Sequence, residues 1–501
     1  MPNDPAELSP EPTSSALPLK QLREFWQSPA PFDPRRALES LETRFEHGKE
    51  LRKVTPREAH AEWTPSTDRV DPVETVLASN AGRLEQLIPL RMGRMAQSPF
   101  AFYRGACAVM AGDLARTPIT GTQVVIGGDA HLGNFGLYGT PQRDVVIDIN
   151  DFDEGTIGPW EWDLKRLAAS VNVAGRGNGL DVAERREVVR HCVGGYAHNA
   201  RRLMHLGILP VWSLFAYAEL KRNLPELKRL GAQFGESVPP IIRDILKKAR
   251  RKHNEALLKK VVRPDATGQW RFVEDPPILM RTDPQTRGSV IASLVEYGES
   301  LSPEYRFMLH RYSAVDVCHR VVGLGSVGLR SYLVLLFGNG VDDPLFLQVK
   351  EATAPAHARY LPPVAFRVQH EGRRVVAVQR GLQALGDPLL GYTTIDGRPY
   401  YVRQMKNLKG SMPLEALVGA PFDFWGWVCG MLLARAHART GDIAKIAGYI
   451  GKSDVFIEAL ADFAEHYGDQ TQNDHAALVS AIASGRVEAI HEQEGASKSQ
   501  E

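Results

Sequence analysis

The sequence predicts a mixed α+β protein in which a larger, mainly helical lobe and a smaller β-rich lobe share one site. Two short β-branched runs, at 124–126 and 145–147, are typical of buried strands, and each precedes an acidic cluster. A strand, a glycine-rich turn and a second strand follow within 320–352. Helical spacing dominates elsewhere, for example at 160–235, so we expect helices combined with short strands.

The acidic clusters have the spacing of a phosphotransfer site. Asp129 precedes Asn134 by five residues, and Asp151 and Asp153 follow the second strand. In phosphotransfer, one carboxylate orients and deprotonates a hydroxyl, while an amide oxygen and a second carboxylate hold Mg²⁺ against the nucleotide phosphates. The pattern therefore predicts a reaction class, although it does not identify a substrate.

A purely structural explanation of these residues stays open, because Asp, Asn and Gly are common in turns. Four carboxylates, however, lie within the seven residues from Asp148 to Glu154, beside an apolar strand. Packing them there is costly unless a cation or a solvent-filled cleft compensates their charge. The density of carboxylates favours a functional site.

A second group of candidate residues lies far downstream. The run GLGSVG contains Gly323, Gly325, Ser326 and Gly328, and the strand-like run RSYLVLLF follows it. In a dinucleotide-binding unit such glycines open a helix, whereas a glycine turn between two strands covers phosphates in kinases. After a Gly-Asn-Gly hairpin signal, PLFLQVKEA puts Lys350 where the kinase strand lysine stands. An ordinary hairpin and an edge-strand lysine that discourages aggregation are the structural alternatives.

Both acidic segments resemble those of known kinases. GGDAHLGNFG is similar to the catalytic loop of aminoglycoside and choline kinases, and NDFDEGTIGPWEWDL is similar to their metal-binding segment. The resemblance implies that Asp129 is the catalytic base and that Asn134 and Asp151 are Mg²⁺ ligands. It further implies a second metal ligand at Asp153 and a structural support of the catalytic loop at Asp163.

One position departs from that pattern, since Gly127 stands where these kinases have a loop histidine. The wider pattern resembles the uncharacterised bacterial domain-of-unknown-function family 2252. It is carried by FYRG at 102–105, GDAHLGNFG, NDFDEGTIGPWEWDLKRLAAS, LGSVGLRSY and LARAHARTGD. This second resemblance covers roughly residues 50 to 480 and implies no established activity.

The order of the parts predicts a circularly permuted version of the protein-kinase-like, aminoglycoside-phosphotransferase-like two-lobe fold. Kinases place the glycine turn and lysine before the catalytic loop, whereas here 320–352 follows it. The run DFWGWVCGMLLARAHART at 423–440 is similar to the helix that directly precedes the catalytic loop in small-molecule kinases. Permutation is tolerated when the original termini are close and exposed. Two unrelated domains with chance matches are the alternative.

The expected domain organisation follows from this order. It comprises a disordered tail at 1–18, a mainly helical larger lobe carrying both loops at 19–310, a small β-rich nucleotide-clamp lobe at 311–410, helices returning to the larger lobe at 411–486, and a disordered tail at 487–501.

Composition narrows the range of partners. The net charge of +1 predicts no general attraction to nucleic acid or to an anionic membrane. No apolar run reaches the length of a spanning helix, and the acidic, Pro- and Ser-rich N-terminus is unlike a signal peptide, so we expect a soluble cytoplasmic protein. The four cysteines have no zinc-ligand spacing and are expected to be reduced core residues.

Taken as an enzyme, the chain is expected to be an ATP- and Mg²⁺-dependent phosphotransferase acting on a hydroxyl of an unidentified small molecule. ATP could be replaced by another nucleoside triphosphate. A catalytically inactive nucleotide-binding regulator and a nucleotidyl transferase on the same fold are the alternatives. Neither the acceptor nor the oligomeric state follows from the sequence.

A few polar side chains remain ambiguous. Arg104 in FYRG could hold a carboxylate or phosphate, or simply pair with a local Asp, and the same holds for Arg380 and Arg403. His131 lies inside the catalytic-loop motif but lacks metal-ligand spacing. Glu351 cannot pair with Lys350, because adjacent strand residues face opposite ways, so Glu371 and Gln379 are the candidate partners of that lysine.

Overall fold

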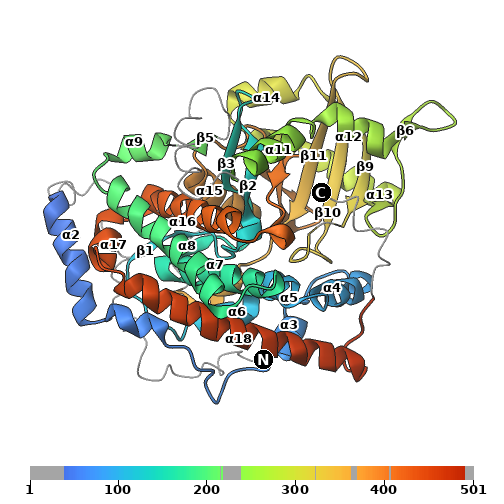
Figure 1. The fold of residues 1–501 in the computed structure, drawn as a ribbon. Coiled ribbons are helices and arrows are strands. Elements are labelled where there is room, and N and C mark those ends of the chain that lie inside the picture. Colours follow the sequence, from blue (N-terminus) through green and yellow to red (C-terminus); the bar gives the residue numbers. More distant parts are fainter. Residues whose placement is uncertain are drawn as a thin grey trace, which may run out of the picture.

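A computed structural model describes residues 39–214, 216–217, 238–321, 323–362, 369–405 and 408–490. It confirms a mixed α+β architecture with many helices and several antiparallel sheets (Figure 1). The expected tail at 1–18 and most of the one at 487–501 lie outside the described residues. Within the described ranges, every helix is too short or too polar to span a bilayer.

Helices form the bulk of the described chain. They are α2 (Leu41–Glu50), α3 (Pro72–Ala78), α4 (Ile88–Met95), α5 (Pro99–Gly105), α6 (Cys107–Leu114), α7 (Trp160–Gly177), α8 (Val182–Leu203), α9 (Ile208–Ser213), α11 (Val238–Arg250), α12 (Asn254–Val261), α13 (Pro284–Ser300), α14 (Pro303–Leu309), α15 (Glu371–Leu382), α16 (Ala420–Thr440), α17 (Ile443–Ile450) and α18 (Val455–Ala483). Their ends follow local chemistry: Asp181 and Glu184 form a reciprocal capping box that starts α8.

The strands are short, and neighbouring strands pair antiparallel. They are β1 (Gln123–Ile126), β2 (Phe135–Gly139), β3 (Val145–Ile149), β4 (Thr156–Pro159), β5 (Ala216–Tyr217), β6 (Val262–Pro264), β7 (Trp270–Phe272), β8 (Leu279–Arg281), β9 (Ser313–Arg320), β10 (Ser331–Phe337), β11 (Pro344–Glu351), β12 (Gly391–Ile395), β13 (Arg398–Gln404) and β14 (Gly410–Ser411). They form a six-stranded sheet in the order β12-β13-β11-β10-β9-β8, a four-stranded sheet β14-β2-β3-β5, and the pairs β1-β4 and β6-β7.

The six-stranded sheet buries both of its faces. On one face, side chains such as Val334 and Val402 pack against Val290 and Tyr297 of α13. The sheet includes β8 and is covered by α13. Both elements precede residue 311, where the β-rich lobe was expected to begin. The reason that sequence patterns missed β8 is physical: three residues are too few to show an alternating pattern.

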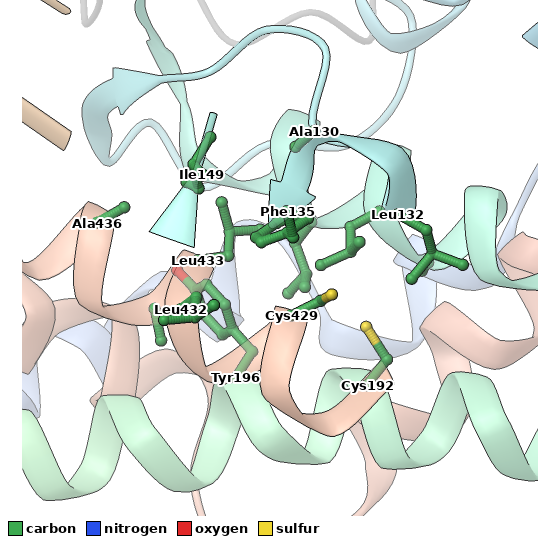
Figure 2. Close-up of a cluster of buried hydrophobic side chains, with 14 of the residues drawn as sticks. Ala130, Leu132, Phe135, Ile149, Cys192, Tyr196, Cys429, Leu432, Leu433 and Ala436 are labelled. Carbon is green, nitrogen blue, oxygen red and sulfur yellow. The ribbon is translucent and has the colours of Figure 1, made fainter. Parts of the chain in front are cut away.

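Helix α16 runs through the centre of the largest hydrophobic cluster and lies beside α8, α7 and strands β1 and β3 (Figure 1). Its apolar side chains pack directly under the segment between β1 and β3. Figure 2 shows Ala130, Leu132, Phe135 and Ile149 on one side of Cys429, Leu432, Leu433 and Ala436, with Cys192 and Tyr196 of α8 beyond them. The four cysteines, Cys107, Cys192, Cys318 and Cys429, are buried and free, as expected.

Candidate functional site

The predicted catalytic loop leaves β1 through a tight turn that needs glycine. Gly128 has φ +75°, and a Cβ there would lie 2.1 Å from the carbonyl oxygen of Glu154. An L side chain is therefore excluded both by backbone conformation and by space. Because Gly128 lies so close to the backbone of Glu154, the catalytic loop packs directly against the acidic segment that follows β3.

Asp163 in the first turn of α7 binds the backbone of this turn. Its two carboxylate oxygens accept hydrogen bonds from the backbone N–H groups of Gly127 and Gly128, at 2.7 and 2.9 Å. His437 of α16 approaches the same carboxylate, with Nε2 3.3 Å from Oδ2. Asp163 thus binds the backbone of the loop and connects the loop to α16.

Asp129 forms an ion pair that local sequence patterns did not predict. The Nε–H of Arg166 donates to Oδ1 of Asp129 at 2.6 Å, and the guanidinium also binds the carbonyl oxygen of Tyr103 at 2.9 Å. Burial raises the pKa of Asp129 to about 7, against the opposing effect of Arg166. A spacing signal existed: Arg166 follows Asp163 by three residues on α7, which puts both side chains on one helix face.

Asn134 and Asp151 are brought close by strand pairing. Asn134 ends a 3₁₀ turn (Leu132–Asn134), and its amide group donates to the carbonyl oxygen of Asp129 at 2.7 Å. The register pairs Phe135 with Ile149, and the N–H of Asn150 donates to the carbonyl oxygen of Asn134 at 2.9 Å. Asn134 therefore lies opposite the residue that precedes Asp151.

Two carboxylate oxygens in the acidic segment are buried without a partner. Oδ1 of Asp151 and Oδ1 of Asp153 accept no hydrogen bond from the described residues. Between them, the side chain of Phe152 is buried in the main hydrophobic cluster and anchors the segment. Leaving two buried carboxylate oxygens without a hydrogen bond is costly, and oxygen donors of this kind suit a hard divalent cation.

Lys350 lies at the end of β11, and its ammonium group forms an ion pair with Asp153. Burial disfavours the charged ammonium, but Asp153 outweighs this effect, so the pKa of Lys350 is raised and that of Asp153 is lowered. The prediction that Glu371 or Gln379 is the partner of Lys350 is therefore wrong. Glu371 pairs with Arg374, and Gln379 donates to Gln383, because α15 directs these side chains along its own surface.

Hydrogen bonds from helix α15 connect the acidic segment with the chain that leaves the six-stranded sheet. The guanidinium of Arg374 donates to the carbonyl oxygens of Asp153 and Thr353, both at 2.8 Å. Thr353 lies two residues after the end of β11, so one buried arginine connects the segment after β3 with the chain that leaves the strand carrying Lys350. This bridge keeps Asp153 and Lys350 on facing surfaces.

The glycine turn connects β9 and β10, and two of its glycines have a positive φ. Gly323 and Gly328 have φ of +67° and +89°. The turn rests on helices near the N-terminus: Arg94 donates to the carbonyl oxygen of Gly323 at 3.1 Å, and the N–H of Leu84 donates to that of Gly328 at 2.8 Å. These contacts hold the turn against the helical part of the molecule. Gly325 and Ser326 lie in the middle of this turn. Arg104 of α5 lies next to Gly325, between the turn and the loop that carries Asp129.

Arg104 of α5 lies close to both the glycine turn and the catalytic loop. Its carbonyl oxygen lies 3.7 Å from the position of a Cβ at Gly325, and its Nε lies 3.7 Å from the position of a Cβ at Gly133. Arg104 therefore lies between the glycine turn and the catalytic loop. His131 helps to shape that loop, since its Nδ1 accepts from the N–H of Gly133 at 3.1 Å, and burial lowers its pKa well below the usual value.

A separate group of buried side chains lies behind the loop. Ligand-type atoms of Cys107, Glu154 and His357 lie within 4.8 Å of one another. Burial raises the pKa of the Cys107 thiol and lowers that of His357 to about 4, so both are neutral near pH 7. Glu154 accepts from the N–H of Ala356 at 2.6 Å. We interpret the group as polar packing between α6, the acidic segment and the chain after β11.

Comparison with known proteins identifies the family. A family model described as an uncharacterized protein conserved in bacteria (DUF2252) matches residues 83–481, so the chain belongs to this family. No curated protein and no solved structure matches the chain. The candidate site lies entirely within the matched residues.

Proposed function

We propose that the protein is an ATP- and Mg²⁺-dependent phosphotransferase with a circularly permuted, kinase-like two-lobe fold. One observation carries the proposal: the ion pair between Lys350 and Asp153 joins β11, the second strand after the glycine turn, to the acidic segment after β3. The two residues are 197 positions apart in the chain. This ion pair supports a single site that combines the proposed base, cation ligands and phosphate-binding lysine, the groups that phosphoryl transfer requires.

Asp129 is the base in this proposal. Its carboxylate accepts the proton of the acceptor hydroxyl, and a pKa of about 7 suits a group that must take up and release a proton near neutral pH. Arg166 holds the carboxylate in position, and Asn134 holds the loop by binding the carbonyl oxygen of Asp129. Lys350 and the backbone of the glycine turn bind the phosphates.

The oxygen-only donor set fits a magnesium ion. Asn134, Asp151 and Asp153 would hold it, and the two unpartnered carboxylate oxygens support this assignment. Bound Mg²⁺ would neutralise charge on the phosphate oxygens. Asn150, paired with the backbone of Asn134, keeps the two sides of the ligand set together.

The permutation is supported by the position of α16. Its residues Arg435 and His437 contact Asp148 of β3 and Asp163 below the loop, and Thr440 accepts a hydrogen bond from the N–H of Val125 in β1. In small-molecule kinases the corresponding helix comes directly before the loop. His437 also brings an imidazole to Asp163, although Gly127 replaces the usual loop histidine.

The test combines nucleotide binding and turnover. We expect the protein to bind ATP in the presence of Mg²⁺ and to hydrolyse it slowly without an acceptor. Asp151→Asn should abolish the Mg²⁺ dependence of ATP binding in a calorimetric titration, while the thermal unfolding of the unliganded protein stays near wild type. Wild-type-like Mg²⁺-dependent binding in this variant would remove Asp151 from the site. Asp442→Asn, which changes a helix cap away from the site, is the matched control.

A regulator without transfer activity is the second candidate, and the ion pair between Asp129 and Arg166 favours it, because a paired carboxylate is a weaker base. Slow ATP hydrolysis separates the two. Asp129→Asn should keep ATP affinity near wild type and lower hydrolysis by about 10²–10⁴-fold if Asp129 is the base. Hydrolysis that is absent in wild type, or indifferent to this change, would favour the regulator. Release of pyrophosphate in place of ADP would indicate nucleotidyl transfer.

A further inference from the structure

Three cationic side chains share the face of the six-stranded sheet that faces the acidic segment. Lys350 pairs with Tyr401 of β13, and two residues along, Arg403 pairs with Gln348, so Lys350 and Arg403 project from the same face. The Nε–H of Arg403 donates to Oε1 of Gln348 at 3.0 Å. On the other side of β11, Lys350 pairs with Ser331 of β10.

Arg320 ends β9 on this same face. Cys318, two residues earlier, pairs with Leu333, which lies two residues after Ser331. The Arg320 guanidinium donates to the sulfur of Met405 at 3.4 Å, and within the described ranges no carboxylate oxygen lies within 4.0 Å of it. Burial, without a compensating carboxylate, lowers the pKa of Arg320 to about 10.

Lys409 supplies a fourth cation from a different sheet. It directly precedes β14, whose residue Gly410 pairs with Leu137 of β2. The carbonyl oxygen of Gly410 and the amide nitrogen of Asn150 each lie 2.7 Å from the position of a Cβ at Gly136. The backbone next to Lys409 therefore lies beside the residue that precedes Asp151.

The environment of Lys409 is strongly positive. Crowding by protein around its ammonium and repulsion from Arg403, Arg320 and Lys350 lower its pKa to about 7, while Asp151 acts in the opposite direction. The side chain as a whole is nevertheless exposed. A lysine that is surrounded by cations and still reaches solvent favours the binding of an anion.

The cations of this region favour a ligand with several negative charges. Arg320, Lys350, Arg403 and Lys409 gather around Asp151 and Asp153, and Asp387 also acts on Arg403. A polyphosphate carries negative charge on several phosphate groups in a row, so it can contact more than one of these cations at once. A monophosphate has a single charged group and can make fewer of these contacts.

We propose that Lys409, together with Arg320 and Arg403, binds the polyphosphate chain of a nucleoside triphosphate and makes the site selective for triphosphates over monophosphates. The inference rests on the proposed function and deepens it, since Lys350 is then one of four phosphate-binding cations. Lys409 comes from the end of the four-stranded sheet, next to β14, whereas the other three cations project from the six-stranded sheet.

The experiment measures binding of ATP, AMP and inorganic tripolyphosphate, each with Mg²⁺, by calorimetric titration of the full-length protein. Lys409→Met should weaken ATP and tripolyphosphate binding by about tenfold or more, since a lost charge-assisted contact has this cost. AMP binding should change by less than about twofold. Lys409→Arg should retain most of the affinity, and Lys259→Met, an exposed lysine of α12, should behave as wild type.

The outcomes separate this inference from the proposed function. Tripolyphosphate binding that depends on Lys409, in a protein without ATP hydrolysis, would support the polyphosphate site and count against phosphotransfer. Unchanged ATP affinity in Lys409→Met would overturn the inference even if turnover is present. Arg320→Met provides a second test, and unchanged affinity in both variants, each with wild-type thermal unfolding, would exclude a polyphosphate site formed by these cations. Wild-type protein that binds none of the three ligands would overturn both proposals.

Discussion

Asp129 shows how burial and a neighbouring cation act on one carboxylate in opposite directions. Burial raises its pKa to about 7, and Arg166, itself buried and stacked 4.3 Å from the Tyr103 ring, limits the rise. Because Arg166 also binds backbone and sulfur atoms of α5 and α6, its position does not depend on Asp129 alone. The pair therefore predicts a measurable pH dependence.

We expect ATP hydrolysis to increase with pH through about 7, as Asp129 loses its proton and becomes able to act as a base. Arg166→Gln removes the charge that favours the carboxylate form, so the pKa of Asp129 should rise and the midpoint of the pH–rate profile should move to higher pH. The measurement is hydrolysis from about pH 5 to about pH 9, which brackets this midpoint. An unchanged midpoint in Arg166→Gln would show that a different group controls the rate.

Two adjacent glycines provide a matched test of the loop geometry. Gly128→Ala should destabilise the protein by about 1–3 kcal/mol and impair nucleotide turnover, because the residue has φ +75° and its Cβ would contact the carbonyl oxygen of Glu154. Gly127→Ala should be tolerated, since the nearest atom to its Cβ, Oδ2 of Asp163, is 3.7 Å away. Chemical denaturation measures both variants, and equal stability would contradict this geometry of the turn.

Helix α7 combines support of the site with buried charges. It carries Asp163 and Arg166 toward the loop, whereas Lys165, between them in sequence, lies in the hydrophobic interior. The Lys165 ammonium has no hydrogen-bond partner among the described residues and lies 5.0 Å from the Phe463 ring. Burial lowers the pKa of Lys165 to about 7, while Glu161, one turn earlier, opposes this effect.

This burial predicts how stability changes with pH. Between about 7 and the ordinary lysine value of 10.5, the unfolded chain holds the Lys165 proton and the folded chain does not. The free energy of unfolding should therefore rise with pH in this window, by up to about 1.4 kcal/mol per pH unit from this group. Below about pH 7 the contribution is constant and unfavourable. Lys165→Met should flatten the rise measured by denaturant unfolding, whereas the exposed control Lys259→Met should leave it unchanged.

The whole molecule depends on long-range packing. The largest hydrophobic cluster contains Leu132 and Phe135 of the loop region, Val378 of α15, and Leu433 and Phe463 of the C-terminal helices. Helix α18 packs along α7 and α8, and α17 packs against α2 (Figure 1). The chain segments before β1 and after β13 therefore belong to the same core.

A chain ending at residue 418 tests this interdependence. It lacks α16 to α18, so it loses the surface against which the catalytic loop, α7 and α8 pack, and we expect no cooperative thermal transition in circular dichroism. If instead the C-terminal helices formed an unrelated domain, the shortened chain would unfold cooperatively on heating. Recovery of a transition on adding the missing segment as a separate chain would support the permuted architecture.

Local sequence signals were enough to predict several strands and turns around the candidate site. The β-branched runs predicted β1 and β3, and the Gly-Asn-Gly signal predicted the hairpin of β10 and β11, because turn and strand preferences are set by neighbouring residues. The same signals missed β8, a strand of three residues, and left the partner of Lys350 undetermined. Both depend on which distant segments meet.

The sequence by itself determined the mixed architecture, the two acidic segments and the strand–glycine turn–strand unit, because alternating hydrophobicity and turn residues act over a few positions. Only the tertiary structure decided that Asp153 pairs with Lys350, that Arg166 pairs with Asp129, and that Lys409 approaches the acidic segment. These pairings follow from burial. Once α7, α15 and the sheet exclude water, a buried charge is stabilised by an oppositely charged group from whichever segment lies closest in space, and separation in sequence carries no information about that distance.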